Sequence, residues 1–441
     1  MKNICLSLYL KSPKAYKILR LYLKLPSVST LVRFLKLASV RPGFYHKLFG
    51  SIINAVHNLN DFDRHVVLLI DEINLKRNLH YDQRRELIVG FEDFGKNRRT
   101  SNPASSALCF MVRSLSGNWR QMIGYVFTSG PIKLDNLNSL VEECLSKLDE
   151  IGLKVMCITT DQASNFFLLF KTLGVKTSEP YFAFKQRKIV VIPDVPHLLK
   201  STRNAIYSNF IATSEGIVKW KHLEDAYYLN IAKNFSYMPK IKDIHIKLPA
   251  FGGKMKVKLA SQILSRSVSV ALKTMRETGQ IDESSFATEQ FCLKINNLFD
   301  ILNSSPSLKR RTTPFHQELR IESEGWKYLK DTYSWIVDWK IFRDLEGQVI
   351  ITSRFRFVKG WLQAINGVMV LMKELKKCKF DYIYTRRLCQ DPIENTFGDI
   401  RGAGGWSDNP TCYDFQSIFQ RVAVNFLVRI AKYKNCEDDD S

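Results

Sequence analysis

TRRLCQDPIENTFGDIRGAGGWSDNPT, residues 385–411, is the stretch that decides the fold. It carries four carboxylates, at Asp391, Glu394, Asp399 and Asp408, among few apolar residues. Asp391 and Glu394 are three residues apart, so on a helix both acids lie on one face. Acids at a helix start with basic neighbours suit a hard divalent cation or a phosphate. A solvated helix start followed by a glycine turn has the same composition, so the rest of the chain must decide.

The composition indicates a globular protein that binds a polyanion. The length of 441 residues is enough for two or three domains, and an apolar fraction of 45% indicates a globular chain. The 65 Lys and Arg residues against 43 Asp and Glu give a net charge of +22. A charge of this sign and size attracts nucleic acid. No apolar run approaches the roughly 20 residues of a membrane span, and the N-terminus lacks a convincing signal-peptide cleavage site. We therefore expect no membrane partner.

The cysteines indicate the compartment. Nine cysteines are scattered without Cys-x-x-Cys pairs, so no zinc finger is visible. Unpaired cysteines of this kind are typical of reduced thiols in the cytosol or nucleus, and we predict a nuclear protein.

Residues 1–60 read as short helices separated by proline breaks. Ser12-Pro13 is a helix cap followed by Pro at the first helical position, and further helices are expected from about Ser29 and over residues 44–56. Short basic helices fit a helix-turn-helix-like module for DNA binding or dimerisation. A plain helical cap on the next domain fits the pattern equally well.

The pattern changes to strands at residue 65. His65 to Ile70 is a buried-strand run that ends in Asp71. Strands are expected at 86–95, 107–113, 122–128, 155–158 and 189–192, and helices at 134–151, 163–173 and 198–206. This order predicts a mixed sheet flanked by helices, and it matches the ribonuclease H-like fold of nucleases, integrases and transposases.

Asp71 and Asp161 each follow a predicted strand. A single Asp at a strand end is usually a turn or a helix cap. If the two strands are neighbours, however, both acids point into one crevice. Two such acids, with a third available at Glu394, favour a metal site.

The strand pattern stops at about residue 201, and long helical stripes follow to 384. The resulting class is α/β, a ribonuclease H-like mixed-sheet domain interrupted by a helical insertion. The predicted divisions are 1–60 (helical), 61–208 (catalytic domain, first part), 209–384 (insertion), 385–435 (catalytic domain, last part) and 436–441 (acidic tail).

The chain resembles P element-type transposases, including those with an N-terminal THAP zinc finger. The resemblance rests on LLIDEINLKRNLHYD (68–82), GFEDFG (90–95), TTDQASN (159–165), PDVPHLLKSTRN (193–204) and RLCQDPIENTFGDIRGAGGWSDNPT (387–411). SPKAYKILR (12–20) also resembles the helix-turn-helix region of that family. The zinc finger itself is missing from this sequence, either lost or truncated from the gene model, so recognition of particular transposon ends is not implied.

The resemblance implies a catalytic triad and two cofactors. Asp71, Asp161 and Glu394 match the family's two catalytic Asp and its Glu, which would hold two Mg²⁺ ions. Supporting roles fall to Asp194 and His197, an Asp-x-x-His element also seen in hAT-type relatives, and to Asp391 and Asp408. The family's inserted domain can bind GTP. No phosphate-binding glycine loop with Lys-Ser/Thr is visible here, so GTP is implied but its site is not located.

The function that follows is Mg²⁺-dependent DNA strand cleavage and strand transfer at transposon ends. The expected partners are transposon-end and target DNA and further copies of the chain in a homo-oligomer. The DNA backbone would contact basic residues, namely Lys96, Arg98, Arg99, Arg386, Arg387 and Arg401. The alternatives are a domesticated, transposase-derived DNA-binding protein without mobility, a ribonuclease of the same fold, and a GTP-binding regulatory protein.

Overall fold

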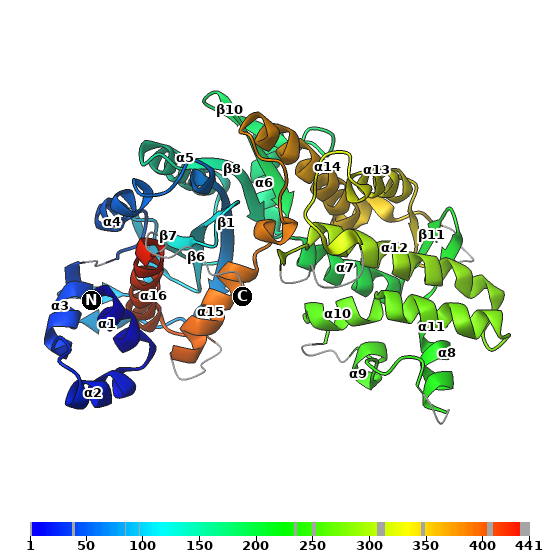
Figure 1. Cartoon of the computed structure of the whole chain (residues 1–441), viewed down its shortest axis with the longest axis horizontal. Coiled ribbons are helices and arrows are strands. Elements are labelled where there is room, and N and C mark those ends of the chain that lie inside the picture. Colours follow the sequence, from blue (N-terminus) through cyan, green and yellow to red (C-terminus); the bar gives the residue numbers. More distant parts are fainter. Residues whose placement is uncertain are drawn as a thin grey trace. The chain divides into compact units, whose positions relative to one another are not determined.

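The computed structural model forms two compact units, one of which is made of two distant segments of the chain. The first unit joins Met1–Thr172 to Gln390–Ser441, and the second is Leu173–Cys389. The structure describes residues 2–37, 40–83, 85–96, 98–232, 236–248, 253–306, 314–344, 349–403 and 409–432. Figure 1 colours the chain from blue to red along the sequence. The helices α15 and α16, which belong to the first unit, follow its strands only after the whole second unit.

A mixed sheet forms the centre of the first unit. Its strands lie in the order β5-β4-β7-β6-β1-β8, and their bounds are β1 His65–Asn74, β4 Phe91–Asp93, β5 Arg99–Pro103, β6 Ser106–Ser114, β7 Arg120–Thr128 and β8 Lys154–Thr160. β1 runs antiparallel to β6 and parallel to β8. The first six residues of β1 are buried, as expected for a strand in the middle of a sheet with both faces covered.

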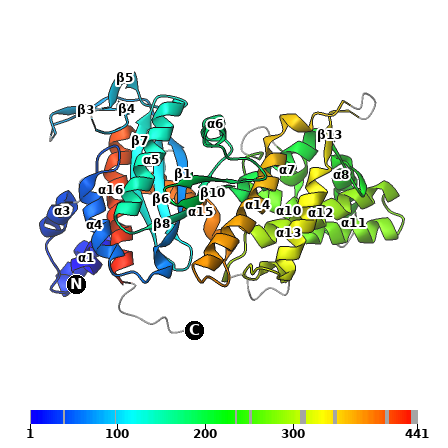
Figure 2. The ribbon, with the colours of Figure 1, turned by 90° about the horizontal axis from the view of Figure 1, so that it is seen from above.

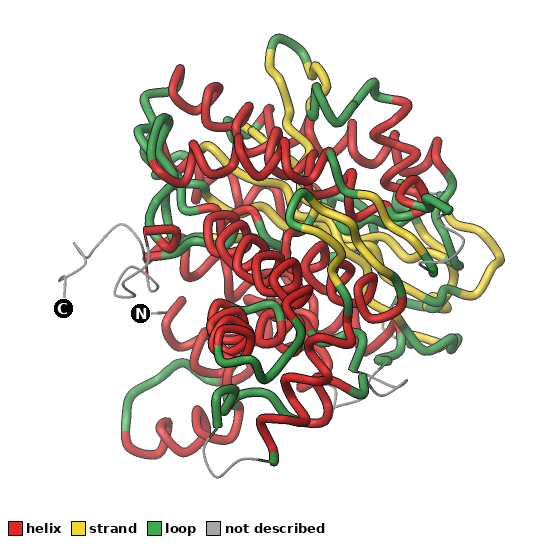
Figure 3. The backbone as a smooth tube through the Cα atoms, turned by 90° about the vertical axis from the view of Figure 1, so that its right-hand side faces the viewer, coloured by secondary structure: helices red, strands yellow, loops and turns green. Residues whose placement is uncertain are grey.

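Helices and a small hairpin complete this unit, and Figure 2 labels several of them, whereas Figure 3 draws the chain with helices red and strands yellow. The helices are α1 Lys2–Lys11, α2 Pro13–Tyr22, α3 Val28–Leu37, α4 His46–Val56, α5 Leu134–Glu150, α6 Ser164–Thr172, α15 Asp391–Ala403 and α16 Cys412–Lys432, with a 3₁₀ turn at Phe62–Arg64. The hairpin pairs β2 His80–Asp82 with β3 Leu87–Val89. α16 packs on β7, where the rings of Phe415 and Phe419 lie 5.1 and 4.6 Å from that of Tyr125.

The N-terminal helices pack onto the same α16. The Ser12 hydroxyl accepts a hydrogen bond from the Ala15 N–H at 3.2 Å, which confirms the predicted cap before Pro13. Cys5, Leu6, Tyr16 and Leu31 form a buried cluster with Val424 of α16. The opposite side of α2 leaves large apolar side chains in solvent, with Leu21 78% and Tyr22 81% exposed. The helices therefore serve as a cap on α16 and also present an apolar outer surface.

The second unit is mainly helical. It contains the antiparallel pair β9 Tyr181–Phe184 and β10 Arg187–Pro193 and a small sheet, β12-β11-β13, of Gly216–Val218, Phe210–Thr213 and Lys340–Phe342. Its helices are α7 Val195–Ser208, α8 Trp220–Ile231, α9 Asp243–Ile246, α10 Val257–Ile263, α11 Arg266–Glu277, α12 Phe286–Leu302, α13 Glu324–Val337 and α14 Arg356–Lys377; 3₁₀ turns lie at Glu283–Ser285, Pro314–His316, Thr352–Arg354 and Thr385–Leu388. In the described part of the chain, no helix is long and apolar enough to cross a membrane.

Two expectations about strands were wrong in detail. Strands occur beyond residue 201, because β11, β12 and β13 are only three or four residues long and too short to show an alternating pattern. The single strand expected over 86–95 is two strands separated at Gly90. Gly90 has a φ of +123°, and a Cβ there would meet the Asn78 carbonyl oxygen at 2.1 Å. The close backbone approach breaks the strand.

Two glycines join the segment before α4 to the sheet. The Gly43 N–H donates to the Tyr125 carbonyl at 2.6 Å, and Gly43 also lies against Gly95. Gly95 has a φ of +75°, and a Cβ on it would stand 2.6 Å from the Pro42 carbonyl oxygen and 3.0 Å from the Gly43 Cα. Only glycine fits both the backbone conformation and the space.

Replacing Gly95 by Ala should therefore destabilise the first unit more than the same change at Gly152. Gly152 has a similar φ, +81°, but open space around it, so its Ala variant should lose only about 1–2 kcal/mol for the left-handed backbone. Gly95→Ala adds a backbone clash and should lose about 1–3 kcal/mol more. Urea unfolding of the two variants measures the difference, and equal losses would contradict the close packing described here.

Candidate catalytic site

The parallel pairing of β1 with β8 leads towards Asp71 and Asp161. The last pair between these strands is Leu69 with Thr159, and each acid lies two residues beyond its member of that pair. Residues paired in this way point to the same face of a sheet. Both side chains are half-buried. The prediction that the two strands are neighbours is thus confirmed, and the meeting of the two carboxylates at one crevice stays a prediction.

Each of these acids also has a local structural bond. Asp71 Oδ1 accepts the N–H of Glu72 at 2.8 Å, and Asp161 Oδ1 accepts the N–H of Ala163 at 3.0 Å. A carboxylate has about four acceptor sites, so one such bond fixes its orientation and leaves capacity for a cation. The turn-forming role and the metal-binding role are therefore compatible.

Gln390 fixes the start of α15 to β1. Its carbonyl accepts the N–H groups of Ile393 at 2.9 Å and Glu394 at 3.1 Å, which begins the helix. Its buried side chain donates from Nε2 to the Ile70 carbonyl at 2.7 Å, and Ile70 immediately precedes Asp71. The first turn of α15 is thereby held at the strand end that carries Asp71. Sequence reasoning missed Gln390, whose only signal was a polar residue directly before the acidic helix start.

Glu394 lies exposed on this first helical turn, and Asp391 is half-buried at the first residue of α15. Acids here are favoured by the positive end of the helix dipole. Among the residues that the structure describes, no three His, Cys, Asp or Glu side chains already stand as a group that could hold a metal ion. The structure thus places Asp71 and Asp161 on or just beyond neighbouring strands and ties the helix of Glu394 to the first of them, but the three do not form a closed ligand set.

The donor atoms at this edge fit Mg²⁺, which prefers carboxylate oxygens and retains several waters. Cys109, paired with Asp71 across β1 and β6, is the nearest soft ligand by register. Complete burial, and then the charges of Asp71 and Glu72, raise the pKa of the Cys109 thiol well above its usual value. Cys109 therefore stays protonated, and neither thiolate coordination nor thiolate nucleophilicity competes with the carboxylates.

The predicted supporting acids have different positions. Asp194 is buried in the second unit and caps α7, because its Oδ2 accepts the His197 N–H at 3.1 Å. The His197 ring nitrogen Nδ1 lies 3.6 Å from the same oxygen. This pair has a structural role at the start of α7. Asp408 lies outside the described residues.

The predicted DNA-backbone residues are only partly accessible. Lys96 Nζ and Arg98 share Glu143, at 2.9 and 3.5 Å, and Arg99 lies in a pocket. Arg386 and Arg401 are half-buried, and Arg387 is only 8% exposed. An exposed lysine ion pair of this kind contributes little energy, so Lys96 can exchange Glu143 for a phosphate, whereas burial keeps most of Arg387 from one.

Three family models match the chain in order. The TNP-like RNase H N-terminal domain matches residues 40–174, the TNP-like GTP-binding insertion domain matches 196–314, and the TNP-like RNase H C-terminal domain matches 387–420. The chain belongs to the P element-type transposases. An insertion that divides a ribonuclease H-like domain is the arrangement predicted from the sequence, and the recognition of the family is confirmed.

Two curated relatives cover nearly all of this transposase-family chain. Human DNA transposase THAP9 is 28% identical over 454 residues, which is 97% of this chain and 48% of the relative. The Transposable element P transposase of Drosophila melanogaster is 26% identical over 446 residues, 98% of this chain and 54% of the relative. The chain thus spans about half the length of both.

The fold agrees with a solved structure of the same family. The chain in the "Drosophila P element transposase strand transfer complex" matches with a TM-score of 0.81 at 24% identity, over 96% of this chain and 91% of that one. The ribonuclease H-like mixed sheet with a helical insertion is therefore confirmed as the fold.

Replacing Gln390 by Leu should loosen the start of α15. The buried Ile70 carbonyl would lose its side-chain donor, so the free energy of unfolding should fall by about 1–3 kcal/mol. Asn395→Leu, at an exposed position of the same helix, is the matched control and should change stability by no more than about 0.5 kcal/mol. Chemical denaturation compares them, and a Gln390→Leu variant as stable as the control would show that the bond to β1 is dispensable.

Proposed function

We propose that this chain is a DNA transposase that cuts DNA and joins DNA strands with Mg²⁺ held by Asp71, Asp161 and Glu394. The observation that supports the proposal is the parallel pairing of β1 with β8, the strands that lead to Asp71 and Asp161, together with the Gln390 bond that holds the helix of Glu394 to β1. Carboxylates from two rigid strand ends and one helix are suited to hard cations against a phosphate. Family membership supports the assignment.

The reaction is an in-line displacement at phosphorus. Mg²⁺, when bound, lowers the pKa of an attacking water or 3′-hydroxyl and offsets the charge on the leaving oxygen. Asp71 lies within β1 and Asp161 directly follows β8, so the backbone positions of both acids are held by the sheet. Glu394 is exposed, so its carboxylate approaches from the solvent side, where DNA must arrive.

DNA is the proposed partner. The net charge of +22 supplies a long-range attraction for the DNA backbone, and Lys96, Arg98, Arg99, Arg386 and Arg401 are the proposed backbone contacts. Such contacts are mostly independent of sequence and weaken steeply with salt. The proposed location is the nucleus, where this DNA lies. A homo-oligomer is proposed for bringing two DNA ends together, and the exposed apolar residues of α2 support it as an oligomer contact.

GTP is the proposed second cofactor, bound in the second unit. The family model over 196–314 supports it by its description. The described part of that region also contains a buried cation, Arg203, whose guanidinium donates to the carbonyls of Gly253 at 3.2 Å and Lys254 at 3.0 Å. Burial lowers the pKa of Arg203 to about 10. Arg203 holds the backbone of Gly253 and Lys254 against α7. We assign it no direct contact with GTP.

A second candidate function is a transposase-derived DNA-binding protein without mobility. It is favoured by the lack, within the described ranges, of a preassembled group of three metal-binding side chains. It predicts DNA binding that is unaffected by Mg²⁺ and no strand cleavage by the wild-type chain. The cleavage measurement below separates the two candidates.

Glu394→Gln should reduce Mg²⁺-dependent cutting of DNA that ends in the element's terminal repeats by about a hundredfold or more, because the variant keeps the shape of a proposed metal ligand but removes its charge. Asp399→Asn, the same change at an exposed acid of α15, is the control and should cut like the wild type. Equal cutting by Glu394→Gln and the wild type would reject the proposed triad. A wild type that binds this DNA with Mg²⁺ present but never cuts it would favour the non-mobile alternative.

GTP should raise the midpoint of thermal unfolding. A ligand at 100 times its Kd stabilises the folded state by about 2.7 kcal/mol, which corresponds to a shift of a few degrees for a chain of this size. Differential scanning measurements with GTP, ATP and no nucleotide test this, each with Mg²⁺. An identical midpoint in all three would remove GTP from the proposal.

A further inference from the structure

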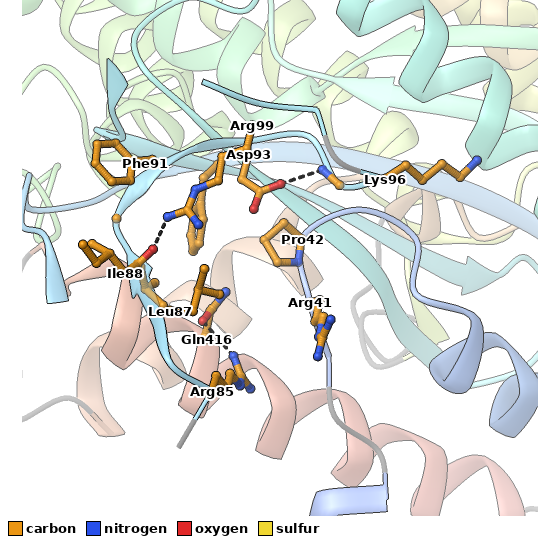
Figure 4. Close-up of a pocket in the computed structure, with 14 residues that line it drawn as sticks. Arg41, Pro42, Arg85, Leu87, Ile88, Phe91, Asp93, Lys96, Arg99 and Gln416 are labelled. Carbon is orange, nitrogen blue, oxygen red and sulfur yellow. Dashed lines mark hydrogen bonds between the residues drawn. The ribbon is translucent and has the colours of Figure 1, made fainter. Parts of the chain in front are cut away.

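A pocket lies in the first unit beside the β2–β3 hairpin, and sequence analysis did not find it (Figure 4). Its volume is about 270 Å³. It is lined by the segment before α4, the hairpin, β4 and the turn after it, with single residues from β5, β7 and α16: Arg41, Pro42, Arg85, Leu87, Ile88, Val89, Gly90, Phe91, Asp93, Gly95, Lys96, Arg99, Phe127 and Gln416. The close glycine contact between Gly43 and Gly95 holds two of these segments together.

The pocket lining has an excess of positive charge. Four of its lining residues are cations, Arg41, Arg85, Lys96 and Arg99, against a single carboxylate, Asp93. Two of these cations also pair with acids outside the lining, Arg85 with Asp82 at 3.5 Å and Lys96 with Glu143 at 2.9 Å. Asp93 Oδ1 accepts the Gly95 N–H at 2.8 Å, so the one acid is bonded to the backbone of the wall. Burial raises the pKa of Asp93 and outweighs the opposing effects of that N–H and of Arg99. An anion is therefore the chemically matched occupant.

Two of the cations are held in place before any ligand arrives. Arg99 donates to the Ile88 carbonyl, and its guanidinium lies 5.1 Å from the centre of the Phe91 ring. The guanidinium has five N–H donors, and the carbonyl uses one. Arg85 donates to Gln416 Oε1 at 3.3 Å. Ordering these side chains in advance lowers the entropy cost of binding an anion.

Arg41 differs from the others, because no described residue pairs with its exposed guanidinium. The apolar wall beside it is also exposed, since Leu87 and Ile88 are 42% and 46% accessible. A phosphate alone would not need an apolar wall. A nucleotide has both a charged phosphate and a flat base, which stacks on apolar or aromatic surfaces.

The pocket lies at the same end and on the same face of the sheet as the candidate catalytic acids. Asp93 pairs with Phe127, Phe127 with Ala107, and Ala107 with Ile73. These four residues form one row across the sheet, and Ile73 is two residues beyond Asp71 on the same face. Three strand spacings separate β4 from β1, which is roughly 14 Å. A DNA strand that crosses this edge can reach both places.

We propose that this pocket receives one unpaired nucleotide of the DNA strand that the catalytic acids act on. Arg41 and Arg85 contact its phosphate, and Leu87, Ile88 and Phe91 contact its base. The inference rests on the proposed function for the identity of the strand. It adds a positioning contact a few nucleotides from the reacting phosphate, where binding energy fixes the register of the DNA on the enzyme.

The test uses the whole chain and oligonucleotides that carry the fluorescent base 2-aminopurine, either unpaired in a single-stranded overhang or paired in a blunt duplex. The pocket variants are Arg41→Ala and Ile88→Ser, both at exposed side chains, so their folding should be unaffected. Arg266→Ala, at an exposed arginine of the second unit, is the control. Circular dichroism melting verifies that all three keep the wild-type midpoint.

The overhang DNA should change its fluorescence on binding, and each pocket variant should weaken its binding about tenfold, as expected for loss of one stacking or phosphate contact. The control should bind the overhang DNA as tightly as the wild type does. The affinities of all these proteins for the blunt duplex should differ by no more than about twofold. Free dAMP forms the last arm: binding of dAMP as tight as that of the overhang would assign the pocket to a free nucleotide and overturn the proposal.

Failure of this inference is distinct from failure of the proposed function. If both pocket variants bind the overhang like the wild type while Glu394→Gln abolishes cutting, the pocket proposal falls and the catalytic one stands. If the wild type never cuts but the pocket variants still lose overhang binding selectively, the pocket is a DNA contact of a non-mobile protein, and the part of the inference that links it to catalysis is overturned.

Discussion

The register between β1 and β8 is the constraint on which the candidate site depends. Side chains alternate between the two faces of a strand, so a slip of one residue would move Asp161 to the face opposite Asp71. The register itself shifts between Val66 and Val67, at an irregularity near the start of β1. The pairing beyond that point is regular up to the strand end. The buried run that precedes Asp71 therefore does more than fill the core, because it determines which acids meet.

A second requirement is that a distant segment completes the same sheet. A buried side-chain bond from Gln390 ties α15 to β1, and α16 covers β7 through ring contacts with Tyr125. The covered face is also the face of Asp71, since Asp71, Cys109 and Tyr125 lie in one row of paired residues. This face of the sheet therefore carries both the aromatic core and one of the candidate acids, Asp71. α16 covers the aromatic core, and α15, which precedes it, carries Glu394.

Much of this arrangement was predictable from local patterns. The apolar run before Asp71, the Ser12 cap and the helical stripes each act within a few residues, so the sequence reveals them directly. The family and the divided fold followed from long motifs. The Gln390 bond, the break at Gly90 and the cationic pocket were not predictable, because each depends on residues far apart in the chain, such as Gln390 with Ile70 and Arg41 with Arg99. The triad of Asp71, Asp161 and Glu394 stays a prediction, since it joins residues from three distant parts of the chain.

The split of the first unit has a consequence for biosynthesis. β1 and β8 leave the ribosome early, but α15 and α16 follow only after all of Leu173–Cys389 has been made. At 5–20 residues per second this delay is roughly 10–45 seconds. During that interval the aromatic side chains of β7 stay exposed because α16 has not yet been made. A nascent chain with such an exposed apolar surface is suited to binding by a chaperone. Because Glu394 is made last, a prematurely terminated polypeptide would carry Asp71 and Asp161 but would lack the third acid of the proposed triad.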